Sequence, residues 1–345
     1  MPGEVREGIL FSLGNPLLDI TARPELEFLQ KYDLKPDNAI LADEKHLHMY
    51  DEMLEKYSLE YSAGGSVLNA ARAFEWIIGV PNASTYTGCI GKDQFGEKLI
   101  AKSQEAGVNV QFMLHPTQAT GKCAVLVTGT SRSLCAYLGA ASCFEKSHLS
   151  NPEVESLIHT AEFFYIEGYH LAASPESIIH LAEHAAEKNK TFVLNMNAPY
   201  LVTCFKEPMM KVLPYVDIIF SNEEEAATFA KEHKFGTTDL QEIALRFIKL
   251  PKVNKKKERV IIITQGSSPV ILAANGKIEL FPVPPIPTEK IIDTNGAGDG
   301  FAGGFLAMLV QNKPLDVCVR CGIYTAGEVI QQDGCTLPKE SKFKE

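Results

Sequence analysis

The feature that most constrains the fold is a repeated alternation of wholly apolar runs with amphipathic runs. Helices are indicated where apolar residues recur every three or four positions, at 66–79, 95–107, 174–190 and 222–234. Buried strands are predicted at 8–14, 84–91, 161–168, 191–197, 216–222 and 259–266. Strands that are apolar on both faces and alternate with helices are typical of a covered parallel sheet. The sequence therefore predicts an α/β fold, a three-layer α/β/α sandwich with a mostly parallel sheet.

Two regions break this alternation. Residues 16–63 contain a polar helical stretch and short extended pieces, and residues 117–142 alternate like a two-stranded hairpin around Gly129. We expect these pieces to form a small sheet that projects from the main layers as a lid. Such a cover excludes water from a reaction site. The predicted division is a large domain of 1–15, 65–116 and 142–345 and a lid of 16–64 and 117–141.

Charge and cysteine usage narrow the class of protein. The formal net charge is −10, and the basic cluster at 252–259 is typical of a solvated loop, so we expect no nucleic-acid partner. The longest apolar runs fall short of the ~18 residues of a membrane span, and the amino-terminal residues do not resemble a secretory leader. Cys318 and Cys321 form a lone C-x-x-C motif that we interpret as core thiols. A cytoplasmic protein is expected, and a nuclear one is also compatible.

A glycine-rich stretch, Asp-Thr-Asn-Gly-Ala-Gly-Asp-Gly-Phe at 293–301, leads into an apolar helical run. Five of the nine residues from 296 to 304 are glycine, although glycine costs a helix roughly 0.5–1 kcal/mol relative to alanine. A helix amino terminus leaves backbone N–H groups unpaired and carries about half a positive charge, so it attracts anions. Gly296 and Gly298 would let a phosphate approach those N–H groups.

Three other phosphate-binding motifs do not match. The dinucleotide fingerprint needs glycine at position 301, where the chain has Phe301. A P-loop needs glycine at the positions held by Pro116 and Tyr86. The His-Arg-Asp and Asp-Phe-Gly triplets of protein kinases do not occur.

Asp299 lies just inside the predicted helix. We expect the helix dipole to lower the pKa of this carboxyl and keep it ionised. A carboxylate beside a phosphate cup repels phosphate, but it can accept a proton from an attacking hydroxyl group. An ordinary helix cap is the alternative, and these residues alone leave both interpretations open.

Four motifs in this order resemble those of the ribokinase-like (PfkB-type) sugar and nucleoside kinases. They are the stretches at 63–73, 222–226, 264–266 and 293–305. The stretch Leu-Gly-Asn-Pro-Leu-Leu-Asp-Ile at 13–20 is similar to the corresponding sequence in the members of this family that phosphorylate adenosine. The resemblance implies ATP-dependent phosphorylation of the adenosine 5′-hydroxyl to give AMP and ADP, with Mg²⁺, by a monomeric enzyme of purine salvage.

The resemblance also implies roles for individual residues. Asp299 would be the general base, and the backbone of Gly296, Ala297 and Gly298 would stabilise the transferring group. Arg132 in the lid would neutralise phosphate, with an ordinary solvated arginine as the alternative. Substrate would contact Asn15, Leu17, Asp19, Leu41, Gly64, Gly65, Ser66, Asn69, Cys123, Leu134, Ala136, Tyr169 and Tyr200. The nucleotide would contact Asn195, Asn222, Thr264, Gly266 and Asn295, and Glu225 would reach the metal through water.

Within this resemblance, Asp19 suits a ribose because a carboxylate accepts hydrogen bonds from both vicinal hydroxyls. Asn69 and Gly65 would complete that clamp, and Asn15 and Ser66 would lie near the base. Two alternatives stay open at this point: a related kinase acting on a sugar or a different nucleoside, and a catalytically silent nucleoside-binding protein.

Overall fold

The computed structural model describes residues 5–36, 38–129 and 131–344. Within these ranges the main sheet has nine strands, parallel from β14 to β7 and antiparallel at the β15–β16 edge. Their order is β16 (Lys277–Phe281), β15 (Ser268–Ala274), β14 (Val260–Gln265), β13 (Ile218–Asn222), β12 (Thr191–Asn195), β11 (Phe163–Glu167), β1 (Leu10–Leu13), β5 (Ser84–Thr87) and β7 (Asn109–Val110). The predicted mostly parallel α/β fold is confirmed, although sequence patterns did not indicate the antiparallel edge.

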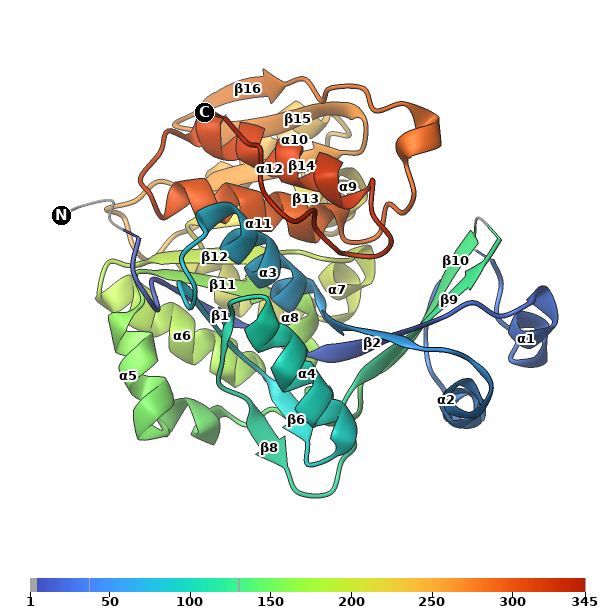
Figure 1. Ribbon diagram of the computed structural model, residues 1–345. Coiled ribbons are helices and arrows are strands. Elements are labelled where there is room, and N and C mark those ends of the chain that lie inside the picture. Colours follow the sequence, from blue (N-terminus) through green and yellow to red (C-terminus); the bar gives the residue numbers. More distant parts are fainter. Residues whose placement is uncertain (1–4, 37, 130, 345) are drawn as a thin grey trace.

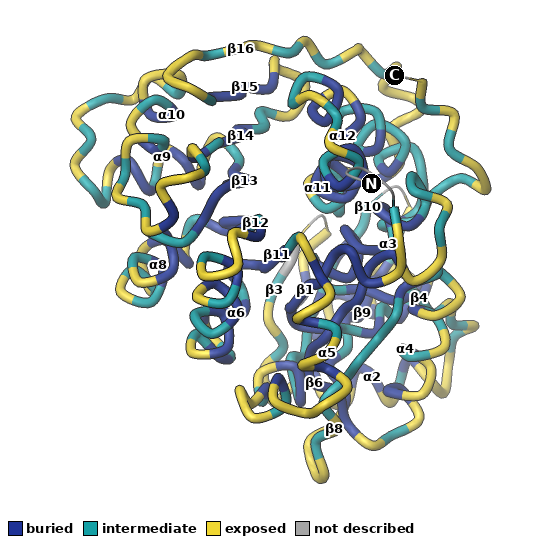
Figure 2. The backbone as a smooth tube through the Cα atoms, turned by 90° about the vertical axis from the view of Figure 1, so that its left-hand side faces the viewer, coloured by how far each residue is buried: buried dark blue, intermediate teal, exposed yellow. Residues whose placement is uncertain are grey.

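Helices cover both faces of this sheet and enclose two separate hydrophobic cores (Figure 2). One face carries α3 (Ser66–Ile78), α4 (Gln94–Glu105), α11 (Ala297–Leu309) and α12 (Leu315–Val329). The other carries α5 (Pro152–Thr160), α6 (Pro175–Glu187), α7 (Pro199–Cys204), α8 (Lys206–Val212), α9 (Glu223–Glu232) and α10 (Leu240–Ile248). β1 is buried along its whole length and β11 in all but its first residue, because both faces of the sheet are covered, which explains their apolar sequences. Cys318 and Cys321 are buried in the first core, as their apolar helical setting predicted.

A second sheet projects to one side of this body (Figure 1). Its order is β3 (Ala39–Leu41), β10 (Ser131–Tyr137), β9 (Lys122–Thr128), β2 (Leu17–Ala22) and β4 (Glu60–Gly64), with α1 (Leu26–Lys31) and α2 (Glu44–Lys56) beside it. The antiparallel pairing of β9 with β10 confirms the predicted hairpin. The polar helix begins at a capping box in which the Asp43 side chain accepts a hydrogen bond from the Lys45 N–H.

The run at 84–91 differs from the prediction of one strand. It divides at Gly88 into β5, which belongs to the main sheet, and β6 (Cys89–Gly91), which pairs with β8 (Met113–His115). A Cβ atom at position 88 would lie 2.5 Å from Pro16 Cδ and 2.6 Å from the Gly14 carbonyl oxygen. The chain therefore bends where it passes closely beneath the β1–β2 turn.

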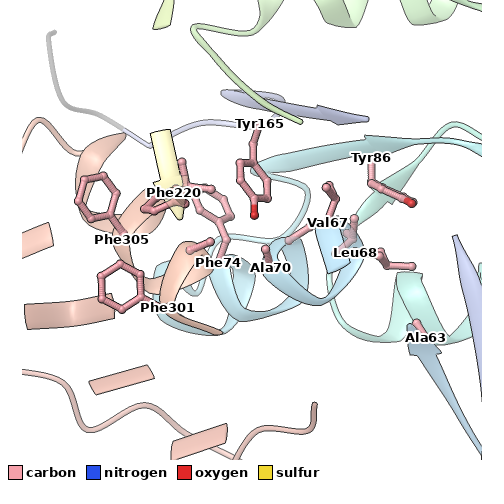
Figure 3. Packing of buried hydrophobic residues seen from close by; sticks show 14 of the residues in the cluster. Ala63, Val67, Leu68, Ala70, Phe74, Tyr86, Tyr165, Phe220, Phe301 and Phe305 are labelled. Atoms are coloured by element: carbon pink, nitrogen blue, oxygen red, sulfur yellow. The ribbon is translucent and has the colours of Figure 1, made fainter. Parts of the chain in front are cut away.

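The packing of α11 against α3 sets the position of both helix amino termini. A Cβ at Gly303 would lie 2.4 Å from the Ala70 carbonyl oxygen, so only glycine permits this approach. Phe301 and Phe305 of α11 pack edge-on against Phe220 of β13, with ring centroids 6.0 and 5.2 Å apart (Figure 3). Gly303 is therefore required for helix packing and not for phosphate binding, the role that the sequence suggested for glycines in this stretch.

No helix within the described ranges combines the length and apolarity that a membrane span requires. The expectation about an amino-terminal leader concerns in part residues 1–4, which lie outside the described residues.

We predict that Gly303→Ala destabilises the protein by about 1–3 kcal/mol, because the added methyl group meets the Ala70 carbonyl and the Ala73 side chain. The matched control is Gly327→Ala in α12, where the nearest atom to a new Cβ is the flexible Ile286 Cδ1 at 3.4 Å. That control should be neutral or stabilising, since alanine favours a helix. Urea unfolding of the two variants measures the difference. Equal stability of both would contradict the packing argument.

Candidate active site

A cavity of about 600 Å³ lies where the two sheets meet, at the carboxyl ends of the main parallel strands. Ligands bind at this edge of open parallel sheets. The cavity is lined from one side by β2 and β10 of the projecting sheet, and from the other by the amino termini of α3 and α11. Its size suits a small organic ligand.

Asp299 lies in the first turn of α11 and faces this cavity. Its carboxylate accepts a hydrogen bond from Ser66 Oγ at 2.7 Å and another from Asn69 Nδ2 at 3.0 Å. Arg72 donates to Asn69 Oδ1 over 3.3 Å, which leaves the amide nitrogen of Asn69 turned toward Asp299. The carboxylate is therefore oriented by side chains of α3. The N-cap position of α11 is held by Gly296, so Asp299 is not the capping residue of its helix.

The expected lowering of the Asp299 pKa is wrong. Burial removes water from the carboxylate and raises its pKa to about 6, although the hydrogen bonds from Asn69 and Ser66 act in the opposite direction. The helix dipole was a poor guide because the cost of desolvation depends on burial, which the position in the helix does not reveal. A carboxylate with this pKa is ionised at neutral pH and is still basic enough to take up a proton.

Asn197 extends this network and was not indicated by any sequence motif. Its Nδ2 donates to Ser66 Oγ over 2.9 Å, and its Oδ1 accepts from the Gly168 N–H over 2.7 Å. Ser66 accepts from Asn197, so its own hydroxyl proton is directed at Asp299. Asn197 has a φ of 64°, a left-handed conformation that asparagine tolerates better than most residues and that a strand-end pattern does not reveal.

The α11 amino terminus presents free donors to the cavity. Gly296 has a φ of 76°, and a Cβ there would lie 2.7 Å from Cys335 Cβ. A Cβ at Gly298 would meet nothing within 4 Å. Among the described residues, the N–H groups of Gly298 and Asp299 have no acceptor, while the Ala297 N–H reaches the Thr294 carbonyl at 3.3 Å. The predicted backbone donors are therefore present in part: the N–H of Gly298 is free, that of Ala297 is already paired, and Asp299 adds a free N–H that was not predicted.

Asp19 of β2 lies deep in the cavity against Gly64, where a Cβ would approach the Asp19 carboxylate to 2.4 Å. Burial raises the pKa of Asp19 to about 7, and the positive charges of Arg72 and Arg132 oppose that rise. A half-buried carboxylate that faces a cavity favours ligand groups that donate hydrogen bonds to it.

Arg132 is not a solvated arginine. It extends from β10 of the projecting sheet to the main body, where its Nε lies 2.9 Å from Asp293 Oδ2 and its Nη1 pairs with Asp333. Asp333 also accepts a hydrogen bond from Arg23 of the projecting sheet at 2.5 Å. The two arginines therefore hold the projecting sheet against the body through Asp293 and Asp333, two carboxylates that sequence patterns did not single out.

Asn222 and Glu225 lie at the far end of the cavity and form a capping box at the start of α9. Asn222 Oδ1 accepts from the Glu225 N–H at 2.8 Å, and Glu225 Oε2 accepts from the Asn222 N–H at 2.9 Å. Burial raises the pKa of Glu225 to about 7, against the lowering effect of those hydrogen bonds. Among the described residues no cluster of three or more acidic, histidine or cysteine side chains could hold a metal ion. This pair fits a metal ion only as an outer contact.

Apolar walls complete the cavity. Leu41 of the projecting sheet is 62% exposed and Tyr200 of α7 is 48% exposed, although both are large and apolar. The rings of Tyr169 and Tyr200 lie 6.4 Å apart at 40°. Exposed apolar and aromatic side chains that line one cavity favour a flat aromatic ligand.

The structure brings together most of the residues predicted for the site. The cavity is lined by Asn15, Leu17, Asp19, Leu41, Gly65, Ser66, Asn69, Cys123, Arg132, Leu134, Ala136, Tyr169, Asn195, Tyr200, Asn222, Glu225, Thr264, Asn295, Gly296, Gly298 and Asp299. Three predicted residues do not line the cavity: Gly64, Ala297 and Gly266. Gly64 and Ala297 are each next in the chain to a lining residue, and Gly266 is two residues from Thr264, which lines the cavity. Glu167, Asn197, Asp293 and Cys335 also line the cavity. Asp293 opens the glycine-rich stretch but was given no role there, and the other three lie at a strand end or in loops without a recognisable pattern.

Comparisons with known proteins agree with this geometry. Residues 27–342 match the family described as pfkB family carbohydrate kinase. Adenosine kinase 2 of Arabidopsis thaliana is 47% identical over 337 residues, covering 98% of each protein. Adenosine kinase of Schizosaccharomyces pombe is 42% identical over 336 residues, covering 97% of each.

Two solved structures are also similar. Anopheles gambiae adenosine kinase superimposes with a TM-score of 0.89 at 47% identity, covering 98% of this chain and 100% of that one. Schistosoma mansoni adenosine kinase, solved in complex with adenosine and AMP, gives a TM-score of 0.87 at 34% identity, covering 98% and 100%.

We predict that the Asp299 carboxyl titrates near pH 6 in the free protein, well above an ordinary aspartate. NMR titration of protein labelled at the aspartate carboxyl carbons measures this, with Asp299→Asn identifying the signal. Ser66→Ala should raise the pKa further, because it removes a donor to the ionised form. A pKa near 4 in the native protein would show that the carboxylate is solvated.

Proposed function

The chain belongs to the pfkB family of carbohydrate kinases, and we propose that it is an adenosine kinase that transfers the γ-phosphoryl group of ATP to the adenosine 5′-hydroxyl. The products are AMP and ADP, as in purine salvage. The observation that carries the proposal is the position of Asp299, a half-buried carboxylate beside unpaired helix amides in a cavity with a second carboxylate and apolar walls. The relatives at 47% identity, which are adenosine kinases, support it.

Adenosine would occupy the half of the cavity beneath the projecting sheet. Asp19 would accept hydrogen bonds from the ribose 2′- and 3′-hydroxyls, with Asn69 and the backbone at Gly64 and Gly65 beside it. The adenine ring would lie between apolar walls, with Asn15 and Ser66 near its edge. The walls are formed by Leu17, Leu41, Cys123, Leu134, Ala136, Tyr169 and Tyr200. A free hexose would leave these walls without an apolar ligand, which disfavours a sugar kinase.

Asp299 acts on the 5′-hydroxyl. As that oxygen attacks the γ-phosphorus and the bond to the ADP oxygen breaks, Asp299 takes the hydroxyl proton. Negative charge that develops on the transferring group would be met by the backbone N–H groups at the start of α11, of which those of Gly298 and Asp299 are free. Such a donor is worth roughly 3–4 kcal/mol in other enzymes, which exceeds the helix cost of a glycine.

ATP would extend from this turn toward β13 and β14. Asn195, Asn222, Thr264 and Asn295 line that part of the cavity, and Gly266 follows β14 at its edge. Mg²⁺ bound to the phosphates neutralises part of their charge and usually keeps several waters. The capping box of Asn222 and Glu225 suits such an ion as a water-mediated partner, because Glu225 already accepts a backbone hydrogen bond.

The projecting sheet would serve as a lid. Arg132 is held by Asp293 and Asp333 in the structure, close to the helix amides at Gly296. An arriving phosphate would compete with these carboxylates for the guanidinium, so Arg132 would join the anion site as the lid closes. A monomer is part of the proposal, as the resemblance to this family implies. The described cysteines form no disulfide bond, which fits the reducing interior of the cytoplasm or nucleus.

Asp299→Asn should lower kcat for adenosine by about 10²–10⁴-fold and leave its KM nearly unchanged, since the amide keeps the size but cannot accept the proton. Asp316→Asn, on the exposed side of α12, is the matched control and should retain native turnover. ADP release measured at saturating ATP decides this. Turnover of Asp299→Asn within a few fold of native would rule out the base.

The pH dependence follows from the same group. With a pKa of about 6, Asp299 is protonated and inactive below that pH, so kcat/KM should rise with pH up to about 6 and then level. A profile that stays flat down to pH 4.5 would contradict the assignment.

Asp19→Ala should lower kcat/KM for adenosine by about 10–100-fold, because the ribose loses hydrogen bonds to a charged acceptor. The loss should be smaller with 2′-deoxyadenosine, which lacks one of the hydroxyls. Thr21→Ala, two residues along the same strand and outside the cavity lining, is the control. Equal losses with both nucleosides would exclude the diol clamp. Failure of the native enzyme to use adenosine in a panel with ribose and hexoses would exclude the proposed function.

A further inference from the structure

His170 lies behind the cavity, in the short 3-10 segment Gly168–Ala172 that follows β11. Its ring is completely buried and packs edge-on against Phe144, with centroids 5.3 Å apart. Its Nδ1 lies 2.7 Å from Asn15 Oδ1. His170 does not line the cavity, but Asn15 does. His170 can therefore affect a ligand only through the side-chain amide of Asn15.

The proton on the His170 ring is assigned from its partners. Burial lowers the pKa of His170 to about 3, so the ring is neutral and carries one N–H. Among the described residues, Nε2 is buried without a hydrogen-bond partner. A buried N–H without an acceptor is rarer than an acceptor without a donor, so the proton belongs on Nδ1. Nδ1 then donates to Asn15 Oδ1.

The backbone of Asn15 is fixed by the same segment. Glu167, the last residue of β11, accepts from the Asn15 N–H at 2.5 Å and from the Val67 N–H at 3.2 Å. The Asn15 carbonyl packs so closely against Gly65 that a Cβ there would lie 2.4 Å from it. Residues 167–170 thus hold both the main chain and the side chain of Asn15, and the amide has little freedom to turn.

We propose that His170 is a positioning residue that fixes the Asn15 amide so that it presents its N–H donors to the purine. The proposal rests on adenosine being the ligand of this cavity. An amide that is free to rotate by 180° can offer either a donor or an acceptor. With Oδ1 committed to His170, only Nδ2 can face the ligand, and it selects a ring nitrogen with a free lone pair. A purine with an N–H at that position would place two donors against each other, and both the Asn15 Nδ2–H and the purine N–H would lack an acceptor.

The test pairs changes in the protein with changes in the ligand. Kinetics of native enzyme, His170→Phe and His170→Asn are measured with adenosine and with its 1-, 3- and 7-deaza analogues, each of which lacks one ring nitrogen. In native enzyme one analogue should show kcat/KM lowered by about 3–10-fold, the worth of a neutral hydrogen bond. In His170→Phe, which keeps the ring but has no donor, that penalty should fall to within about twofold.

His170→Asn can place an amide N–H close to the position of Nδ1 and should restore the penalty. His170→Gln should not restore the penalty, because its amide reaches past the position of Nδ1. If His170→Phe does not fold, His170→Gln takes its place as the variant without the donor. A purely structural histidine would lower rates with all four nucleosides alike. A deaza penalty unchanged by loss of the His170 donor, or no penalty with any analogue in native enzyme, would overturn the proposal.

A second measurement does not depend on turnover. A long-range ¹H–¹⁵N spectrum of the labelled native protein should show the His170 proton on Nδ1, and a proton on Nε2 would overturn the proposal. Absence of adenosine phosphorylation by the native enzyme would instead contradict the proposed function, so the two failures are distinguishable.

Discussion

The close contact between α11 and α3 is the constraint on which the rest of the site depends. Gly303 lets the two helices approach until its backbone touches the Ala70 carbonyl, and both helices then begin at the same cavity. α11 supplies Asp299 and free amides, and α3 supplies the donors Ser66 and Asn69. The contact shields the carboxylate from bulk water on one side and also gives it its hydrogen bonds. The opposing effects of desolvation and hydrogen bonding leave its pKa near 6, a value suited to a base at neutral pH.

The charges around the cavity explain why a mobile cover is useful. Asp19, Asp293 and Asp299 all line the cavity into which the proposed function brings a triphosphate. Arg132 is paired with Asp293 and with Asp333 of the carboxyl-terminal loop. Through these contacts, the position of the projecting sheet depends on whether a phosphate occupies the anion site. A phosphate that draws Arg132 from its carboxylates would couple nucleotide binding to closure over the nucleoside.

Much of this arrangement could be predicted from sequence because its signals are local. Wholly apolar strands indicated a covered parallel sheet, and the glycine-rich turn indicated an anion site with Asp299 beside it. Three features could not be found in that way. The bend at Gly88 depends on contacts with Gly14 and Pro16, far away in the chain. The pKa of Asp299 depends on burial, and the side-chain contacts of Asn197 exist only in the folded protein.

The central claim is that the Asp299 carboxylate meets the hydroxyl that is phosphorylated. A crystal structure of the native protein with adenosine and a non-hydrolysable ATP analogue tests it most directly. We predict a carboxylate oxygen of Asp299 at about 2.6–3.2 Å from the adenosine 5′-oxygen, with the terminal phosphate at the free backbone amides at the start of α11. A nucleoside bound with its 5′-oxygen away from Asp299, or a phosphate held elsewhere, would contradict it.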